Sequence, residues 1–252
     1  MRLLAFGDSL TAGYHALGTA FSPWADNLAR SLGVNWRDGK HIGLSGWTAR
    51  QLASTLDMAQ LGPDNAGRCW PGLRATLEHA RPDGYDLVVI MVGTNDLADK
   101  ERPEGIVQCI SRLHSEAHAH GSRTVAVNIP ESKVAMCVPW LGELRLRTNL
   151  QLEEWAAQQG DRVLYVDMAA EIPYASDSGM WEPDGLHFSA HGYQEFGIRL
   201  APHLRRYVST WPAEAANRPA SAHSIGDVVR LHGLQTAQYN DRVGVVEKVG
   251  TT

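Results

Sequence analysis

Ser9 stands where a short first strand has to turn. Residues 5–10 read Ala-Phe-Gly-Asp-Ser-Leu and come directly after the apolar pair Leu3-Leu4. Gly7 and Asp8 are residue types that favour turns and helix caps. Such a turn exposes the Ser9 hydroxyl beside unpaired backbone N–H groups, as a nucleophilic serine requires. An ordinary turn can use the same residues, so this segment alone does not establish a nucleophile.

Three further segments carry groups that could assist a serine nucleophile. They are Gly43-Leu44-Ser45-Gly46-Trp47-Thr48, Gly93-Thr94-Asn95-Asp96 and Asp184-Gly185-Leu186-His187. Each of them alone could also be a plain turn. Together with the Ser9 segment, and in this order, they resemble the blocks of the SGNH (GDSL-type) hydrolase family. The resemblance covers roughly residues 2–208 and is greatest to the arylesterase and acyltransferase branch.

The resemblance implies a role for each matched residue. Ser9 corresponds to the family's nucleophile, and Asp184 and His187 correspond to the Asp-x-x-His pair of its catalytic triad. The N–H of Ser9, Gly46 and Asn95 correspond to its oxyanion hole. The expected reaction needs no metal or organic cofactor.

Elementary chemistry supports these roles independently. A serine is a weak nucleophile unless a base is adjacent, and the imidazole of His187 can be that base. Asp184 can accept the Nδ1–H of the imidazole and direct its Nε2 toward Ser9. A tetrahedral intermediate carries a negative oxygen, for which the side-chain amide of Asn95 and a backbone N–H made accessible by Gly46 are suitable donors.

Alternating apolar strands and amphipathic helices must position these groups. Strands are predicted at 2–6, 41–44, 86–92, 124–129 and 163–167, with helices near 21–32, 49–59, 73–80, 103–120, 142–159 and 190–208. Continuous apolar strands are typical of a parallel sheet covered on both faces. We therefore expect a three-layer α/β/α, flavodoxin-like sandwich with a five-stranded parallel sheet. All four segments then lie at its carboxyl edge.

Two histidine patterns compete with His187. Asp38-Gly39-Lys40-His41 repeats the Asp-x-x-His spacing, but His41 opens a strand and so belongs at the amino edge, away from Ser9. His114 and His118, with His120 beyond, could ligate zinc from one helix face. Glu116 does not follow the first histidine as the metalloprotease motif demands, so a solvated helix face is predicted instead.

Other polar and aromatic residues near the four segments have structural explanations. Asp8 and Asp96 are predicted to brace turns by accepting backbone hydrogen bonds, rather than to act as a carboxylate pair. Trp47, next to Gly46, is the first candidate to line a substrate pocket. Further candidates, for which packing is an equally good explanation, are Trp24, Trp140 and Trp181.

Composition excludes several classes of function. The chain has 252 residues and a formal net charge of -5, without a long basic run, so nucleic-acid binding is not indicated. No apolar run reaches membrane-spanning length and the chain opens on its first strand, so a cytoplasmic location is expected. The widely spaced Cys69, Cys109 and Cys137 are expected to be reduced thiols, two of them in or near the core.

The C-terminal part has a different character. Residues 1–210 form the expected hydrolase domain, and residues 211–226 are rich in Pro, Ala and Ser and predict a linker. Two strand-like runs at 228–231 and 243–249, with turn residues at 239–241, predict a small β appendage in 227–252 that resembles a fragment of an SH3-like barrel.

The sequence thus predicts a serine esterase that hydrolyses short-chain carboxylic esters through an acyl-enzyme. Its expected partner is a small ester substrate. Acetylated sugars, aryl esters, thioesters, lysophospholipids and acyl transfer to an alcohol stay open as alternatives on the same site. A non-catalytic binding module of the same fold is a different-class alternative. A nucleotide or flavin binder is disfavoured because Asp8 would repel phosphate and no glycine-rich phosphate loop follows.

Overall fold

The structure is a computed structural model that describes residues 1–34, 39–80, 84–211, 228–230 and 243–245. The chain divides into two compact units, Met1–Trp211 and Pro212–Thr252. The first unit contains all four segments singled out above.

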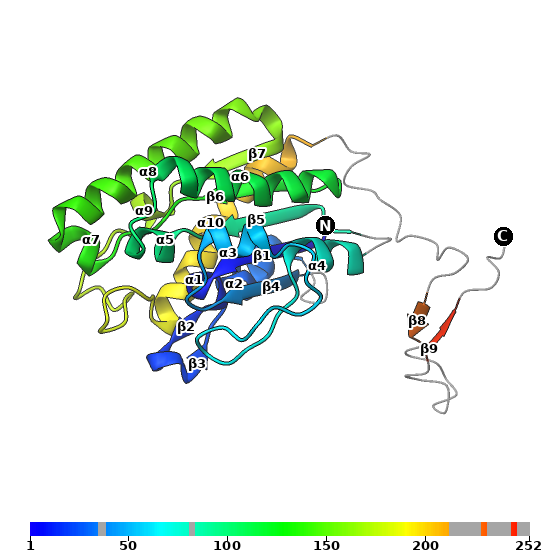
Figure 1. The fold of residues 1–252 in the computed structure, drawn as a ribbon, viewed down its shortest axis with the longest axis horizontal. Coiled ribbons are helices and arrows are strands. Elements are labelled where there is room, and N and C mark those ends of the chain that lie inside the picture. Colours follow the sequence, from blue (N-terminus) through cyan, green and yellow to red (C-terminus); the bar gives the residue numbers. More distant parts are fainter. Residues whose placement is uncertain (35–38, 81–83, 212–227, 231–242, 246–252) are drawn as a thin grey trace. The chain divides into compact units, whose positions relative to one another are not determined.

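A five-stranded parallel sheet forms the centre of the first unit (Figure 1). Its spatial order is β4 (Gly39–Leu44), β1 (Leu3–Asp8), β5 (Leu87–Met91), β6 (Arg123–Val127) and β7 (Val163–Val166). The chain therefore starts beside the sheet edge, steps outward to β4, and returns across β1 to build the other half. The connection from β1 leads to β4 on one side of it, and the connection from β4 leads to β5 on the other side, which creates a topological switch point between β1 and β5.

Side chains of successive strand residues enter two different cores, as strand geometry requires. On one face, Leu4, Phe6 and Val88 pack against the helices α3 (Ala49–Ser54), α4 (Leu73–His79), α6 (Pro103–Ala119) and α8 (Pro139–Gln158). On the other face, Leu3 and Ala5 pack against α2 (Trp24–Leu32), α9 (Met168–Glu171) and α10 (Ala190–Ser209). The predicted three-layer α/β/α sandwich is confirmed.

Short elements that periodicity did not reveal join the longer ones, most of them at the carboxyl edge of the sheet. They are α1 (Ser9–Ala12), α5 (Thr94–Ala98), α7 (Lys133–Cys137), the 3-10 turns η1 (Ala16–Gly18) and η3 (Gly160–Arg162), and the hairpin of β2 (Tyr14–His15) and β3 (Ala20–Phe21). Each has too few residues to show a helix or strand period.

The predicted helix boundaries shift at three places. The helix predicted from Phe21 begins at Trp24, because Phe21 pairs with Tyr14 in the hairpin and Pro23 occupies the N-cap position. The helix predicted at 49–59 ends at Ser54. The helix predicted from Gly142 begins at Pro139, whose fixed φ suits the first helical position.

Only two short strands of the second unit are described. Strands β8 (Val228–Arg230) and β9 (Val243–Val245) pair antiparallel, in agreement with the two strand-like runs. The predicted linker, apart from Trp211, and the predicted turn at 239–241 lie outside the described residues, and the likeness to an SH3 fragment stays a prediction.

The environment of the cysteines differs from the prediction. All three are free thiols, but Cys69 and Cys137 are exposed, and only Cys109 packs partly against the core. Among the residues that the structure describes, no helix is long and apolar enough to cross a membrane.

Candidate active site

The Ser9 side chain lies at the switch point of the sheet. Ser9 directly follows β1 and opens α1, and Asp8 caps that helix by accepting a hydrogen bond from the Leu10 N–H at 3.0 Å. In open α/β sheets ligands bind at the carboxyl ends of the strands beside such a switch point. The fold therefore places the Ser9 hydroxyl where a substrate can reach it.

His187 and Asp184 complete a continuous line of hydrogen bonds to Ser9. The Nε2 of His187 is 3.0 Å from the Ser9 Oγ, and its Nδ1 is 2.7 Å from the Asp184 Oδ2. The other oxygen of Asp184 accepts the backbone N–H groups of Leu186 and His187. Although partial burial opposes ionisation, these hydrogen bonds hold the pKa of Asp184 below its usual value. The carboxylate therefore stays charged beside the imidazole.

The loop that carries this pair is held at both ends. An isolated bridge joins Trp181 to Phe188, and the N–H of Glu182 donates to the carbonyl of His187 at 2.8 Å. At the tip of the loop, the carbonyl of Gly185 accepts the N–H of Lys133 at 2.7 Å. The imidazole is thus presented by a small closed turn rather than by a free loop.

Two of the predicted oxyanion donors lie on neighbouring loops. Asn95, in α5 after β5, donates a side-chain hydrogen bond to the carbonyl of Trp47 at 2.8 Å, which fixes the plane of its amide and links it to the loop of Gly46. Gly46 has φ +82°, a conformation that costs an L side chain energy. A Cβ at this position would also meet the side-chain amide of Asn65 at 2.0 Å.

Asn65 is a neighbour of the site that sequence reasoning missed. Its backbone N–H donates to the carbonyl of Ser45, next to Gly46. The adjacent Asp64 is buried, accepts the Ser45 N–H at 3.0 Å and pairs with Arg68 at 2.7 Å. The signal available in the sequence was the Asp-Asn-Ala-Gly run at 64–67, which is typical of a tight polar turn.

The two buried carboxyls near Ser9 brace turns, as predicted. Asp8 caps α1, and Asp96 accepts the N–H of Ala49 at 2.8 Å. Burial raises the pKa of Asp8 to about 7, with the neighbouring Asp96 adding to the rise and backbone N–H groups opposing it. Burial likewise raises the pKa of Asp96. Among the described residues, neither carboxyl makes a hydrogen bond to His187 or Asp184.

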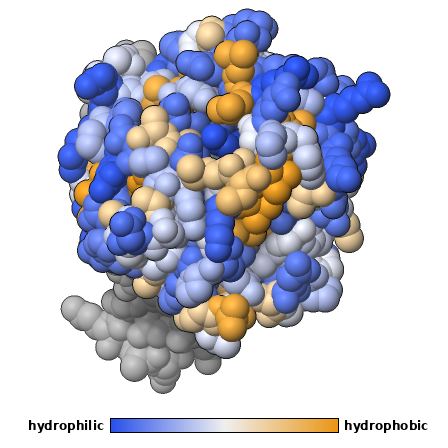
Figure 2. All heavy atoms as spheres, turned by 90° about the vertical axis from the view of Figure 1, so that its left-hand side faces the viewer, coloured by the Kyte–Doolittle hydropathy of each residue, from blue (hydrophilic) through white to orange (hydrophobic). Residues whose placement is uncertain are grey.

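An apolar cavity of about 260 Å³ opens beside Asn95 and Asp184. Its wall is formed by α1, α5, the segment after β6, α7 and the start of α8, and includes Leu10, Leu97, Ala98, Ile129, Pro130, Val134, Ala135, Leu141 and Leu186. Figure 2 shows this end of the molecule, where apolar side chains gather between polar ones. Val134, Met136 and Trp140 of α7 and α8 are among the exposed apolar residues. Leu10, which follows Ser9 in the chain, and Asp184 line this cavity, whereas Ser9 and His187 do not.

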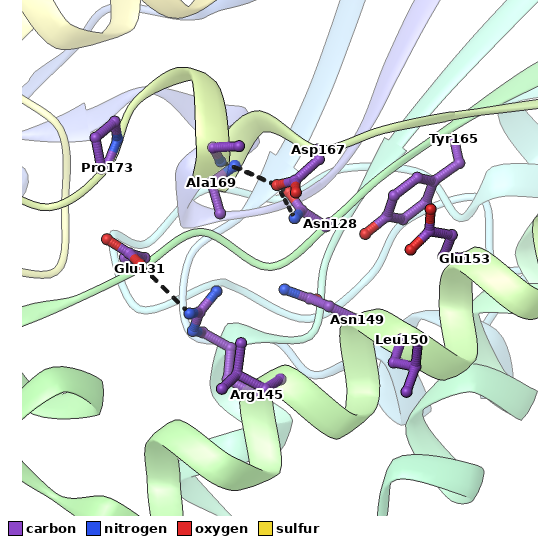
Figure 3. Close-up of a pocket in the computed structure, with 12 residues that line it drawn as sticks. Asn128, Glu131, Arg145, Asn149, Leu150, Glu153, Tyr165, Asp167, Ala169 and Pro173 are labelled. Carbon is purple, nitrogen blue, oxygen red and sulfur yellow. Dashed lines mark hydrogen bonds and ion pairs between the residues drawn. The ribbon is translucent and has the colours of Figure 1, made fainter.

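A second cavity, of about 370 Å³, lies at the carboxyl ends of β6 and β7 (Figure 3). Arg145 and Glu131 form an ion pair of 3.5 Å and line both cavities. Asn128 donates to Asp167 at 2.6 Å, and Asn149 binds the backbone of Ile129. These polar side chains are largely used to join the strand ends to α8, and neither Ser9 nor His187 lines this cavity.

The tryptophan candidates separate clearly. Trp47 is partly buried against one core, and its carbonyl orients Asn95. Trp24 is fully buried and Trp181 nearly so, both in the other core, so packing explains them and neither lines a described cavity. Trp140 is 47% exposed, with the Lys100 ammonium 5.3 Å from its ring centre.

The competing histidines lie elsewhere, and one prediction about them is wrong. His41 contacts Asp26 at 3.9 Å, whereas Asp38 lies outside the described residues. His114 does not face solvent: it is fully buried, and its Nδ1 and the Nε2 of His118 both contact the Thr124 hydroxyl, at 2.7 and 3.0 Å. His114 and His118 lie on the side of α6 that faces β6, and the spacing of the histidines in the sequence did not indicate which side that is. Within the described ranges, no three potential metal ligands cluster.

Comparisons with known proteins agree with this geometry. The model of the GDSL-like lipase/acylhydrolase family matches residues 5–195, which is more than half of the chain. A comparison with curated protein sequences finds no match.

Solved structures share the fold at low sequence identity. TesA is 22% identical with a TM-score of 0.59, over 82% of this chain and 99% of TesA. An acetyl esterase mutant crystallised with acetate is 17% identical with a TM-score of 0.59, over 83% of this chain and 99% of that one. A family 3 carbohydrate esterase of Clostridium thermocellum is 18% identical with a TM-score of 0.60, over 82% and 97%.

Proposed function

The chain belongs to the GDSL-like lipase/acylhydrolase family, a family of carboxylic ester hydrolases, and from this premise we propose that it is a serine esterase acting on short-chain carboxylic esters. The observation that carries the proposal is the unbroken line from the Ser9 Oγ through His187 to Asp184, with contacts of 3.0 and 2.7 Å. A hydroxyl, a base and a carboxylate that orients the base are the parts that acyl transfer by serine requires.

In the proposed reaction Ser9 attacks the acyl carbonyl while the Nε2 of His187 accepts its proton. The same imidazole, now charged and stabilised by Asp184, returns the proton to the leaving alcohol. An acyl-enzyme on Ser9 remains. Water then gives a proton to His187 and attacks the acyl carbonyl. When the bond between the acyl carbon and the Ser9 Oγ breaks, His187 returns this proton to the Ser9 oxygen, and the released acid leaves both residues ready for another cycle. The chemistry needs no metal or organic cofactor.

Negative charge on the carbonyl oxygen would be met by three N–H groups. These are the backbone N–H groups of Ser9 and Gly46 and the side-chain amide of Asn95. The hydrogen bond from Asn95 to the Trp47 carbonyl supports this role, because a donor that is already oriented loses no energy to reorganisation during the reaction. In this arrangement Trp47 contributes through its backbone rather than as a wall of the substrate pocket.

The apolar cavity supports a limit on acyl length. Its volume of about 260 Å³ is below the usual range for pockets that hold drug-sized ligands, which favours small acyl groups. Acetyl and butyryl esters are natural first probes, since one of the similar structures is an acetyl esterase. The likeness to the arylesterase and acyltransferase branch, and the expected cytoplasmic location, stay predictions.

A panel of p-nitrophenyl esters from acetate to dodecanoate tests the proposal, with Ser9→Ala as the control. We expect kcat/KM to be highest for the short acyl chains and to fall toward dodecanoate, and Ser9→Ala to lose at least ~10⁴-fold in kcat while keeping the circular dichroism of the wild type. Turnover that survives in Ser9→Ala would place the nucleophile elsewhere, and a wild type without turnover on any ester would favour a binding module. Addition of an alcohol to the assay reports acyl transfer as a new ester product.

A further inference from the structure

The Tyr14 ring lies against the imidazole of His187. The two ring centres are 4.5 Å apart and the planes are inclined by 36°, at the short end of the range for stacked aromatic pairs. Ser9 and Asp184 occupy the two nitrogens of the same imidazole. The ring of Tyr14 therefore limits rotation of His187 out of the line between its two hydrogen-bond partners.

The surrounding structure holds the Tyr14 ring in this place. The buried hydroxyl of Tyr193, on α10, donates to the carbonyl of Tyr14 at 3.0 Å. The ring of Phe21, opposite Tyr14 in the hairpin, meets it edge-on with centres 5.9 Å apart. A Cβ at Gly18 would lie 2.6 Å from the Cε2 of Tyr14, so only glycine leaves room for the ring there.

The hairpin is also tied to the loop that carries His187. The backbone N–H of Ala16 donates to the Oε2 of Glu182 at 2.9 Å, and Glu182 in turn donates its N–H to the carbonyl of His187. Hairpin and loop are 166 residues apart in sequence at this contact. Tyr14 and His187 are thus fixed relative to each other by backbone as well as by the ring contact.

We propose that Tyr14 is a positioning residue of the esterase, whose ring keeps the imidazole of His187 aligned between Ser9 and Asp184. The inference rests on the proposed function. The ring acts in a second way when His187 carries the proton, since the face of a tyrosine ring attracts a cation within about 6 Å of its centre. Among the described residues the Tyr14 hydroxyl makes no hydrogen bond, so the ring rather than the hydroxyl performs the role.

The test compares Tyr14→Leu with Tyr14→Phe, using Leu17→Ala as a matched control. Leu17 is 86% exposed in the same hairpin. On p-nitrophenyl acetate we expect Tyr14→Leu to lose about 10-fold in kcat with KM within two-fold, because alignment of the base matters in the reaction rather than in binding. Tyr14→Phe and Leu17→Ala should keep kcat within two-fold. An equal loss in the Phe variant, or a change in KM alone, overturns the proposal.

Proton NMR gives a readout that does not need turnover. The Nδ1–H of His187, shared with Asp184, should give a low-field signal in the wild type and in Tyr14→Phe that broadens or disappears in Tyr14→Leu. An unchanged signal in Tyr14→Leu overturns the positioning role. Failure of the proposed function would instead appear as turnover in Ser9→Ala, so the two failures are distinguishable.

A variant that keeps Tyr14 covers the case in which Tyr14→Leu does not fold. Gly18→Ala adds a methyl against the ring at a position with φ +82°. Gly33→Ala is its matched control, because Gly33 has φ +70° but nothing within 4 Å of its added Cβ. We expect Gly18→Ala to lower kcat at least three-fold more than Gly33→Ala. Equal effects of the two substitutions contradict the proposal.

Discussion

Two imidazole–hydroxyl pairs in this molecule are nearly alike in distance and differ in everything else. His187 meets the Ser9 hydroxyl at 3.0 Å at the carboxyl edge of the sheet, and His114 meets the Thr124 hydroxyl at 2.7 Å between α6 and β6. The second nitrogen of His187 contacts Asp184, whereas that of His114 is buried and has no hydrogen-bond partner in the described part of the chain.

Surroundings decide which pair can move a proton. His114 is fully buried, and its ring lies 4.9 Å from the ring of Trp155. Burial, with His118 nearby, lowers the pKa of His114 to about 3, so this imidazole stays neutral and cannot hold a proton in a reaction. At the proposed catalytic pair of Ser9 and His187, the Asp184 carboxylate contacts the imidazole, and 13% of the His187 side chain is exposed. A short contact to a hydroxyl is therefore not by itself a sign of catalysis.

The carboxylate is the sharpest difference between the pairs, and removing it should have the largest effect. We expect Asp184→Asn to lower kcat for p-nitrophenyl acetate about 10⁴-fold with little change in KM, because a neutral amide no longer stabilises the protonated imidazole or selects its tautomer. Thr124→Val, which breaks the buried pair, should keep kcat within two-fold. Comparable losses in both variants would show that the two pairs do not differ in function.

The second difference between the two pairs is the set of proposed oxyanion donors, which belongs to the Ser9 pair and has no proposed counterpart at Thr124. Asn95→Ala should lower kcat about 10²- to 10³-fold and leave KM nearly unchanged, because the amide acts on charge that exists only in the transition state. Steady-state kinetics on the acetate ester measures both quantities. Asn65→Ala is the matched control, because Asn65 contacts Gly46 without being an expected donor, and a loss larger than that of Asn95→Ala would reverse the assignment.

The buried pair of His114 and Thr124 should affect the free energy of unfolding rather than the turnover of the ester. An imidazole whose folded-state pKa is about 3 binds fewer protons than the unfolded chain between pH 6.5 and 3, so stability falls as pH falls through this window. From pH 6.5 to 5.0 the wild type should lose about 2 kcal/mol that His114→Asn does not lose. Urea unfolding of both proteins at the two pH values measures the difference.

The wild type must be compared with His114→Asn, because Asp8 changes the free energy of unfolding with pH in the opposite direction to His114. The folded-state pKa of Asp8, about 7, lies above the 3.8 of an unperturbed aspartate, so the folded chain holds an extra proton between these pH values, and Asp8 makes the free energy of unfolding fall as pH rises through them. The exposed His79, replaced by Gln, serves as control. A slope for His114→Asn equal to that of the wild type would mean that His114 titrates normally.

Much of the candidate site was predictable because it depends on chain order. Apolar runs fixed the parallel sheet, and each of the four segments follows a strand or precedes the last helix. A parallel sheet brings such positions to one edge whatever the loops do. The same argument removed His41, which lies within β4 and contacts Asp26.

The predictions about the burial of His114 and of the cysteines failed for the same reason, since each required knowing which way a side chain faces. His114 was expected in solvent and lies in the core. Two of the three cysteines were expected in or near the core, whereas Cys69 and Cys137 are both exposed. The hairpin that carries Tyr14 was missed because two-residue strands have no period to detect. Asn65 was missed because its position depends on how a turn packs onto a different loop.

The sequence by itself determined the three-layer sheet architecture and the residues available for chemistry, because residue period and strand order are properties of the chain. Only the tertiary structure decided that the imidazole of His187 meets Ser9 while that of His114 meets Thr124, and that a tyrosine from a distant hairpin covers the former. Such contacts join positions far apart in the chain, and their distances follow from the packing of helices and loops, which no local pattern encodes.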